Sequence, residues 1–486
     1  MGDADCLLVL DAPNLEYIGS EALLGKFRVI EYPKLKYVDD WTFAGNKYLK
    51  EVNLPSLEAV PYSCFKDCYV LRTVKLDNVV SIDTDAFAYC YRLKNIYAPK
   101  LTSLLATDDI DVGTFYRCYN LTEVNFPFVT KVSEFCFNEC NKLEKVKFDN
   151  ALVIKHMAFN LCQKLNSIYF PKVKTIEQFA FYMAYNLKNA DLSSVETIED
   201  KAFVNTGIET MNAPNLKKLG SYAFANQSYI TLELKINPTL TTLIAPNLEN
   251  ADNYAFAYTG GLTELDLPNL TTIGENAFCE SSVNYLYAPN LKTAGSLPTA
   301  DNSVIVTKSD FEECTEVNPN PTLTIQGEKG SYAENYTDKY NLEFVDVDAK
   351  GGSIRVIDAG LRFGFSFYDT KNKNVEEFGF IYSDSSTDNK LLTAYNADGK
   401  TIYNMSAPNR IRHDDGVTTY NLVFTDIPES SYDFNISARA YVKINGKYFY
   451  SDILTRSFSQ VAQAVLADND IDSNTKETIR NMLKSA

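Results

Sequence analysis

The 486-residue chain has few of the residues from which enzymes usually build catalytic sites. It contains one tryptophan and two histidines, His156 and His413, which lie in different regions. No Gly-x-Ser-x-Gly motif, His-Glu-x-x-His motif or glycine-rich phosphate loop occurs. The many carboxylates are scattered at variable positions, which indicates solvated surface. We therefore expect no enzyme, no catalytic residue and no cofactor, and we interpret His156 as a surface or turn residue.

Basic charge and long apolar runs are also lacking. The formal net charge is -17 and the pI is near 4.8, whereas a nucleic-acid-binding protein needs a basic footprint for the phosphates. No run of about 18 apolar residues occurs, so the sequence predicts no membrane insertion. We expect neither nucleic acid nor membrane among the partners.

What the chain has instead is an internal repeat of about 22 residues. The most regular residue of the repeat is a phenylalanine, and Leu23 occupies its position in the first copy. Twelve copies with this period indicate a solenoid, because one unit cannot bury its own apolar face and must stack on its neighbours. The phenylalanines are Phe43, Phe65, Phe87, Phe115, Phe137, Phe159, Phe181, Phe203, Phe224, Phe256 and Phe278.

Each repeat contains a short strand. Apolar residues lie six, nine and eleven positions after the phenylalanine, as at Leu71, Val74 and Leu76 after Phe65. This spacing predicts a strand whose ninth and eleventh residues point inward and whose eighth and tenth point outward. A proline often follows and ends the strand. A second apolar position about five residues before the next phenylalanine fills the return path, so the strands stack into a parallel ribbon.

The repeat resembles a known family. It reads Ile-x-x-x-Ala-Phe-x-x-Cys-x-x-Leu-x-x-Ile-x-Leu-Pro, as in Ile198–Phe203 and Ala158–Pro171. Over residues 8–297 it resembles the BspA-type leucine-rich repeat of bacterial surface proteins. The resemblance implies a β-rich leucine-rich repeat solenoid, a cell-surface location and adhesion to host proteins or other bacteria. Residues 325–344 resemble the segment that closes such arrays, where Ser331 and Glu334 have the spacing of a helix capping box.

The N-terminal segment fits the second half of a repeat. Leu7–Ile18 contains Ala12 and Pro13, which match Ala98 and Pro99 of a full copy. The chain therefore begins inside a repeat, with neither a basic segment nor an apolar signal sequence before it. We expect the natural N-terminus and its signal peptide to be missing, and an extracellular or cell-surface location.

The cysteines follow the repeat. Cys64 with Cys68 and Cys136 with Cys140 could be metal-ligand pairs, and ten cysteines could form disulfides. Stacked repeats give cysteine side chains parallel directions, which is a poor geometry for a disulfide. We favour a ladder of buried, reduced thiols and expect no metal, with disulfides and metal binding as the alternatives. The ladder comprises Cys68, Cys90, Cys118, Cys140 and Cys162.

Two insertions interrupt the period. The first, residues 104–113, contains Asp108, Asp109 and Asp111 but lacks the calcium-loop pattern, so we favour a solvated loop over a calcium site. The second, residues 228–238, alternates apolar and polar residues from Ile230 to Ile236, which predicts an extra strand or hairpin.

Candidate ligand contacts lie at the outward strand positions, because a regular ribbon presents variable residues on a fixed frame. Tyrosine there offers a large amphipathic contact area at low entropic cost. Good strand propensity is the alternative explanation for exposed tyrosine. The candidates are Lys75, Asn95, Tyr97, Lys145, Lys147, Tyr169, Tyr285 and Tyr287.

The period changes after Phe344. Strict alternation in Leu361–Phe367 and Phe434–Ile444 indicates antiparallel strands, with a hairpin signal at Asn445 and Gly446. We predict a β-sandwich that resembles modules of extracellular proteins of gut Firmicutes. Arg439 and Tyr441 are expected on its exposed face. Two short helices follow, and the second is expected to begin with a cap formed by Asn474 and Glu477.

These patterns predict four parts and one function. The parts are a solenoid at residues 1–297, its cap at 298–345, a β-sandwich at 346–458 and a helical tail at 459–486. The predicted function is that of a monomeric, non-enzymatic adhesin whose solenoid binds host or bacterial surface proteins, with the sandwich as a spacer or second binding module. The alternatives are a glycan-binding accessory protein of polysaccharide degradation and a structural surface stalk.

Overall fold

The computed structural model describes residues 11–23, 27–106, 112–227, 233–369, 375–383, 403–406, 411–412, 416–444 and 446–485. The chain divides into two compact units, one of residues 1–305 and 313–323 and the other of residues 306–312 and 324–486. The boundaries predicted at residues 297, 345 and 458 stay predictions.

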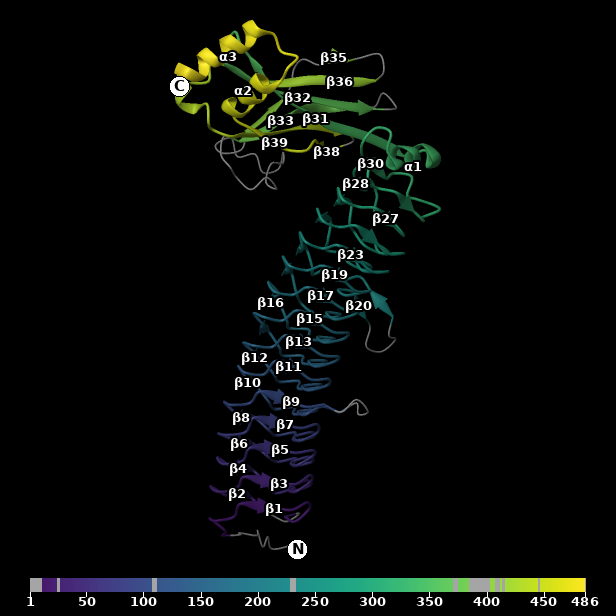
Figure 1. Ribbon diagram of the computed structural model, residues 1–486. Coiled ribbons are helices and arrows are strands. Elements are labelled where there is room, and N and C mark those ends of the chain that lie inside the picture. Colours follow the sequence, from purple (N-terminus) through teal and green to yellow (C-terminus); the bar gives the residue numbers. More distant parts are fainter. Residues whose placement is uncertain are drawn as a thin grey trace. The chain divides into compact units, whose positions relative to one another are not determined.

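The first unit is a leucine-rich repeat solenoid, and its longer strands stack in parallel (Figure 1). In most of these three-residue strands the central residue points inward and its two flanking residues point outward, as the alternation predicted, whereas Val304–Val306 is buried throughout. The strands are β2 (Val29–Glu31), β4 (Glu51–Asn53), β6 (Thr73–Lys75), β8 (Asn95–Tyr97), β10 (Glu123–Asn125), β12 (Lys145–Lys147), β14 (Ser167–Tyr169), β16 (Asn189–Asp191), β18 (Thr210–Asn212), β22 (Thr242–Ile244), β24 (Glu264–Asp266), β26 (Tyr285–Tyr287) and β28 (Val304–Val306).

The return path of each repeat forms a second parallel ribbon, of which the sequence had predicted only the apolar position. Its strands have two residues, of which the second is buried. They are β1 (Tyr17–Ile18), β3 (Tyr37–Val38), β5 (Ala59–Val60), β7 (Ser81–Ile82), β9 (Ser103–Leu104), β11 (Lys131–Val132), β13 (Val153–Ile154), β15 (Thr175–Ile176), β17 (Thr197–Ile198), β19 (Lys218–Leu219), β23 (Asn250–Ala251), β25 (Thr272–Ile273), β27 (Thr293–Ala294) and β29 (Glu313–Cys314).

Eight of the repeat phenylalanines, from Phe43 to Phe203, form one continuous stack of rings inside the solenoid. From Phe43 to Phe203, neighbouring rings have centroids 5.1–5.5 Å apart and planes within 13° of parallel. This is the offset stacking that aromatic rings prefer, and the rings are fully buried. The first insertion does not interrupt the stack, because Phe87 and Phe115 remain 5.5 Å apart with planes at 3°.

The cysteine ladder lies beside this stack. The Sγ atom of each ladder cysteine donates a hydrogen bond to the carbonyl oxygen of the phenylalanine one repeat earlier, as from Cys90 to Phe65 at 3.2 Å and from Cys162 to Phe137 at 3.2 Å. All five thiols are buried and free. Burial raises the pKa of Cys68 to about 12, so its thiol stays protonated at physiological pH.

The turn around most of the repeat phenylalanines has a left-handed residue two positions before the ring and another two positions after it. Glu139, two residues after Phe137, has a φ of 61°, and Leu161 at the same place in the next repeat has a φ of 59°. A side chain in this conformation costs roughly 1–2 kcal/mol. Hydrogen bonds to the following repeat hold it, since the Glu139 and Leu161 N–H groups donate to Asn160 and Tyr182 at 2.8 Å. No residue pattern had predicted these turns.

The insertions are described in part. Residues 107–111, with Asp108, Asp109 and Asp111, lie outside the described residues, as do residues 228–232. Around the second insertion, β20 (Asn226–Gln227) and β21 (Leu234–Lys235) pair antiparallel, which confirms the predicted extra strand.

The second unit opens with β30 (Thr324–Gln326), α1 (Tyr332–Tyr340) and β31 (Glu343–Arg355), and β30 pairs with β31 in parallel. The predicted helix forms with Ser331 as its N-cap residue, but the Ser331 side chain makes no capping hydrogen bond. Glu334 accepts a hydrogen bond from the N–H of Gly330 at 2.7 Å instead. The predicted capping box is therefore wrong in its pairing, because the glutamate reaches past the serine.

Two antiparallel sheets follow in the second unit, as predicted. One contains β31, β32 (Gly360–Asp369), β36 (Val417–Phe424) and β35 (Ile411–Arg412); the other contains β34 (Tyr403–Ser406), β33 (Val375–Ser383), β37 (Ile436–Ile444), β38 (Lys447–Tyr450) and β39 (Leu454–Arg456). Aromatic rings from the two sheets meet in the core, with Phe365 of β32 5.5 Å from Phe380 of β33. The antiparallel pairing of β37 with β38 confirms the predicted hairpin.

The exposed position predicted for Tyr441 is wrong. Its side chain is fully buried, and its hydroxyl donates to Glu377 at 2.6 Å. Arg439 is half-buried, donates to the carbonyl of Ser451 at 3.0 Å and lies 4.5 Å from the Tyr450 ring. The alternation placed both residues opposite the apolar stripe, but this face of the sheet carries an aromatic cluster of its own, with Tyr441, Tyr450 and Ile381.

The tail forms two helices after β39, α2 (Phe458–Ala467) and α3 (Ser473–Ser485), and a short 3-10 helix (Glu429–Ser431) precedes β37 in the sheet region. Helix α2 begins with a capping box of Ser457 and Gln460. The cap predicted for α3 is wrong, because Asp472 accepts from the Thr475 N–H at 2.9 Å and hydroxyl at 2.6 Å. Ile479 of α3 packs with Phe458 of α2. Within the described residues, no helix combines the length and apolarity needed to span a bilayer.

We expect truncation of one stacked ring to destabilise the solenoid strongly. Phe159 is fully buried, and its ring lies 5.3 Å from those of Phe137 and Phe181. Phe159→Ala should lower the free energy of unfolding by about 3–5 kcal/mol, because it removes buried area and leaves a cavity. Urea denaturation followed by circular dichroism measures the loss. Phe128→Ala is the control, since Phe128 is 52% exposed; an equal loss in both variants would contradict the role of the stack.

We also expect the ladder thiols to be protected from reagent. Among the nine described cysteines, Cys279 is half-buried and the other eight are buried. In a Cys6→Ser variant at mildly alkaline pH, a thiol reagent should modify Cys279 in the native protein and the others only after denaturation, because buried, protonated thiols are poor nucleophiles. Mass spectrometry identifies the modified residues. Rapid modification of Cys90 or Cys140 without denaturant would show that the ladder is open.

Candidate functional site

The eight predicted contact residues lie on the first ribbon, at the two outward rows of its strands. The ribbon brings Lys75 of β6 beside Tyr97 of β8, and Lys147 of β12 beside Tyr169 of β14. Tyr97 and Tyr169 are 54% and 48% exposed. They therefore offer ring area to a ligand, and whether they bind one stays a prediction.

Of the other candidate residues, some form ion pairs within the protein and others lie far from Tyr97 and Tyr169 along the ribbon. Lys75 forms an ion pair with Asp77 at 3.3 Å, and Lys147 forms one with Asp149 at 3.5 Å. Lys145 is exposed on β12. Tyr285 and Tyr287 lie on β26, paired with Glu264 and Asp266 of β24, and both are half-buried. The ribbon thus separates these two tyrosines from the other six residues by many repeats.

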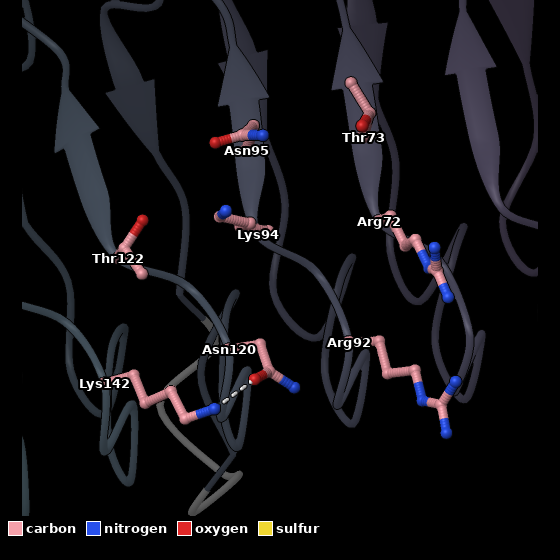
Figure 2. Close-up of a pocket in the computed structure, with 8 residues that line it drawn as sticks. All are labelled: Arg72, Thr73, Arg92, Lys94, Asn95, Asn120, Thr122 and Lys142. Atoms are coloured by element: carbon pink, nitrogen blue, oxygen red, sulfur yellow. Dashed lines mark hydrogen bonds between the residues drawn. The ribbon is translucent and has the colours of Figure 1, made fainter.

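An open groove of about 570 Å³ lies on this ribbon beside the starts of β6, β8, β10 and β12. Figure 2 shows the side chains of Arg72 and Arg92 extending in the same direction from neighbouring repeats. Asn95 is the one predicted contact residue that lines this groove. The full lining is Arg72, Thr73, Arg92, Lys94, Asn95, Asn120, Thr122 and Lys142.

The groove is basic. Four of its lining residues are cations and none is a carboxylate. The Lys142 ammonium donates to the Asn120 side-chain oxygen at 2.7 Å (Figure 2). The Asn120 amide donates to the Tyr91 carbonyl at 2.8 Å. These bonds brace one end of the groove. Within the described residues, Arg72, Arg92 and Lys94 make no ion pair, so their charges are available to an anionic ligand.

A second cluster of cations, near the phenylalanine turns, is already neutralised. Lys66 bonds Asp85 at 2.6 Å, and Arg117 bonds Glu139 at 3.0 Å. Burial raises the pKa of the Asp85 carboxyl above its ordinary value, although the Lys66 ammonium opposes this shift. The Arg117 guanidinium also lies 4.9 Å from the Tyr116 ring. These cations serve the packing between repeats, and the groove is therefore the better candidate for a ligand.

Whether the histidines or clustered metal-ligand side chains form a catalytic arrangement depends on their surroundings. His156 lies between the rings of Phe135 and Phe179, at centroid distances of 5.4 and 5.8 Å, and contacts both edge to face, so it packs between neighbouring repeats. His413 lies outside the described residues. Within the described ranges, no group of three or more His, Cys, Asp and Glu side chains could hold a metal ion.

Most of the groove lies outside the predicted contact residues. Those residues are outward strand positions, in most repeats eight and ten positions after the phenylalanine, whereas the groove's cations lie five and seven positions after it, where the chain enters the strand. A signal was present: the seventh position is basic in three consecutive repeats, at Lys50, Arg72 and Lys94, and Arg28 lies one period of 22 residues before Lys50.

Comparison with known proteins agrees with the fold. Residues 12–107, 108–231 and 237–320 match the family model of the BspA-type leucine-rich repeat region, which has six copies. No curated protein sequence matches the chain.

Two solved structures are also among the matches. An internalin from Listeria monocytogenes is 13% identical with a TM-score of 0.22, and the match covers 60% of this chain and 87% of that one. The APL1 leucine-rich repeat domain is 14% identical with a TM-score of 0.23, and the match covers 65% and 88%. TM-scores this low carry no argument about function.

Proposed function

Because the chain belongs to the BspA-type leucine-rich repeat family, we propose that its solenoid is a non-enzymatic module that recognises proteins. Leucine-rich repeat solenoids typically bind proteins and are typically not enzymes. The proposed contact surface is the first ribbon from β6 to β14, together with the basic groove beside it.

The observation that carries this proposal is the contrast between the buried and exposed residues of the ribbon. Val74, Val124 and Val146 are buried at the same strand position and differ little between repeats. The outward residues on either side of them vary in charge, size and polarity, and Tyr97 and Tyr169 stand half exposed among them. A rigid frame with variable outward side chains suits recognition of a large partner. Exposed tyrosines are frequent anchors of protein interfaces.

The finer proposal is an adhesin. BspA-type repeats are typical of cell-surface or secreted proteins, so we place this protein outside the cell or on its surface, as a monomer that contacts host or bacterial surface proteins. The antiparallel sheets of the second unit then serve as a spacer or a second binding module.

Replacement of the two exposed tyrosines tests the contact surface. We expect the wild-type protein to bind at least one member of a panel of immobilised extracellular-matrix and bacterial surface proteins. Tyr97→Ala with Tyr169→Ala should weaken that binding about tenfold or more, because truncation of a buried aromatic anchor commonly costs 1–2 kcal/mol or more. Surface plasmon resonance measures the affinity.

The matched control is Tyr37→Ala, because Tyr37 is 54% exposed but lies on β3 of the second ribbon. Unchanged affinity in the double variant would show that Tyr97 and Tyr169 of the first ribbon do not contribute to the interface. A parallel glycan array separates the function classes: binding to glycans alone would favour the polysaccharide accessory protein, and binding to neither would favour the structural stalk.

A further inference from the structure

A row of four cations runs along the edge of the solenoid, one in each consecutive repeat. The Lys50 N–H donates to the carbonyl of Arg28 at 2.8 Å, and the Arg72 N–H donates to that of Lys50 at 2.8 Å. The Lys94 N–H continues the row with a bond of 2.9 Å to Arg72. These bonds place the four residues directly above one another, at the strand spacing of about 4.8 Å. We refer to Arg28, Lys50, Arg72 and Lys94 as the basic row.

The basic row is not compensated by the protein. Within the described residues none of its four members makes an ion pair, and Arg28, Arg72 and Lys94 are exposed. At another position of the solenoid, the charges of three consecutive repeats alternate in sign and form ion pairs: Glu196 pairs with Lys174 at 2.8 Å and with Lys217 at 3.4 Å. Like charges at this spacing repel each other. An anionic partner relieves that repulsion, and the row therefore has the electrostatics of a binding site.

The local charge permits such a partner despite the acidic chain. Residues 27–106 contain 11 Lys and Arg and 9 Asp and Glu, whereas the whole chain has a net charge of -17. Two members of the row, Arg72 and Lys94, also line the basic groove, which adds Arg92 and Lys142. At physiological salt the Debye length is about 8 Å, so distant acidic residues repel an anionic ligand little at this site.

The spacing of the row selects the shape of the ligand. Acidic residues on one face of an α-helix recur once per turn, at about 5.4 Å, close to the row's spacing of about 4.8 Å. Alternate residues of an extended peptide lie about 6.7 Å apart, which loses register with the row within three repeats. A sugar chain finds no ring on which to stack, because no aromatic side chain lines the groove.

We propose that the basic row and the groove seat an acidic α-helix of the partner protein, which presents one Asp or Glu per turn to one cation per repeat. The proposal rests on the proposed function, since it names the class of segment that the solenoid recognises. Thr73, Asn95 and Thr122 then face the polar flanks of that helix. The helix lies along the solenoid axis, across the strands.

Two peptides of equal composition test the proposal. One is an N-acetylated, C-amidated helix of about 20 residues, long enough to be helical in water, with Glu at every third or fourth position on one face. The other has the same residues with Glu distributed around the helix. Fluorescence anisotropy with the whole protein should show tighter binding of the striped peptide, and weaker binding as salt rises.

Charge-neutralising variants locate the site. Arg72→Gln with Lys94→Gln should weaken binding of the striped peptide about tenfold or more, since loss of cations that contact carboxylates costs complementarity. Lys174→Gln with Lys217→Gln is the matched control, because it removes two cations whose partner is Glu196. It should leave the affinity nearly unchanged. Thermal unfolding of each variant confirms that it is folded.

Each other outcome overturns the proposal. Equal binding of the two peptides would show that the basic row does not distinguish carboxylates on one helix face from carboxylates distributed around the helix. Binding of a sulfated heparin fragment but of neither peptide would assign the row to anionic glycans. If neither peptide binds while the protein panel still detects a partner sensitive to Tyr97→Ala with Tyr169→Ala, the acidic helix is wrong and the proposed protein recognition stands.

Discussion

Stacking of each repeat on the next is the interaction on which the rest of the structure depends. A single repeat cannot bury its phenylalanine, so the ring of Phe137 is covered by those of Phe115 and Phe159 at 5.1 and 5.3 Å. The backbone follows the same rule, since the Phe137 N–H donates to the carbonyl of Ala158 in the next repeat at 2.8 Å. Each repeat therefore satisfies its neighbour's apolar and polar groups together, and even the left-handed turn residues are held by bonds to the next copy.

This constraint decides where the chain is free to vary. Positions that touch the neighbouring repeat keep their size and polarity, whereas outward positions of the ribbon and the residues that enter each strand do not. Extra residues are tolerated where they leave the stack, as between Phe87 and Phe115. Binding capacity therefore lies in departures from the repeat, and the fixed strand spacing converts a recurrent basic residue into a row of evenly spaced charges.

Much of this could be read from the sequence, because the repeat gives each position the same surroundings in every copy. Inward and outward strand residues and the buried cysteines follow from that regularity, and the structure confirms them. The wrong predictions concern residues for which a local sequence rule was overridden by contacts with one particular neighbour. Tyr441 alternates like an exposed residue but joins a second aromatic cluster. Ser331 has the spacing of a helix cap, yet Glu334 reaches Gly330 instead.

By itself the sequence determined the solenoid, its period and the set of buried side chains, since these depend on apolar spacing that is repeated twelve times. Only the tertiary structure decided which charges are available to a ligand. Lys66 and Arg72 look alike in sequence, but Lys66 finds Asp85 at 2.6 Å in the next repeat whereas Arg72 lines an open groove. Residues about 20 positions apart come into contact through stacking, and the pairing of a charge depends on which neighbour lies there.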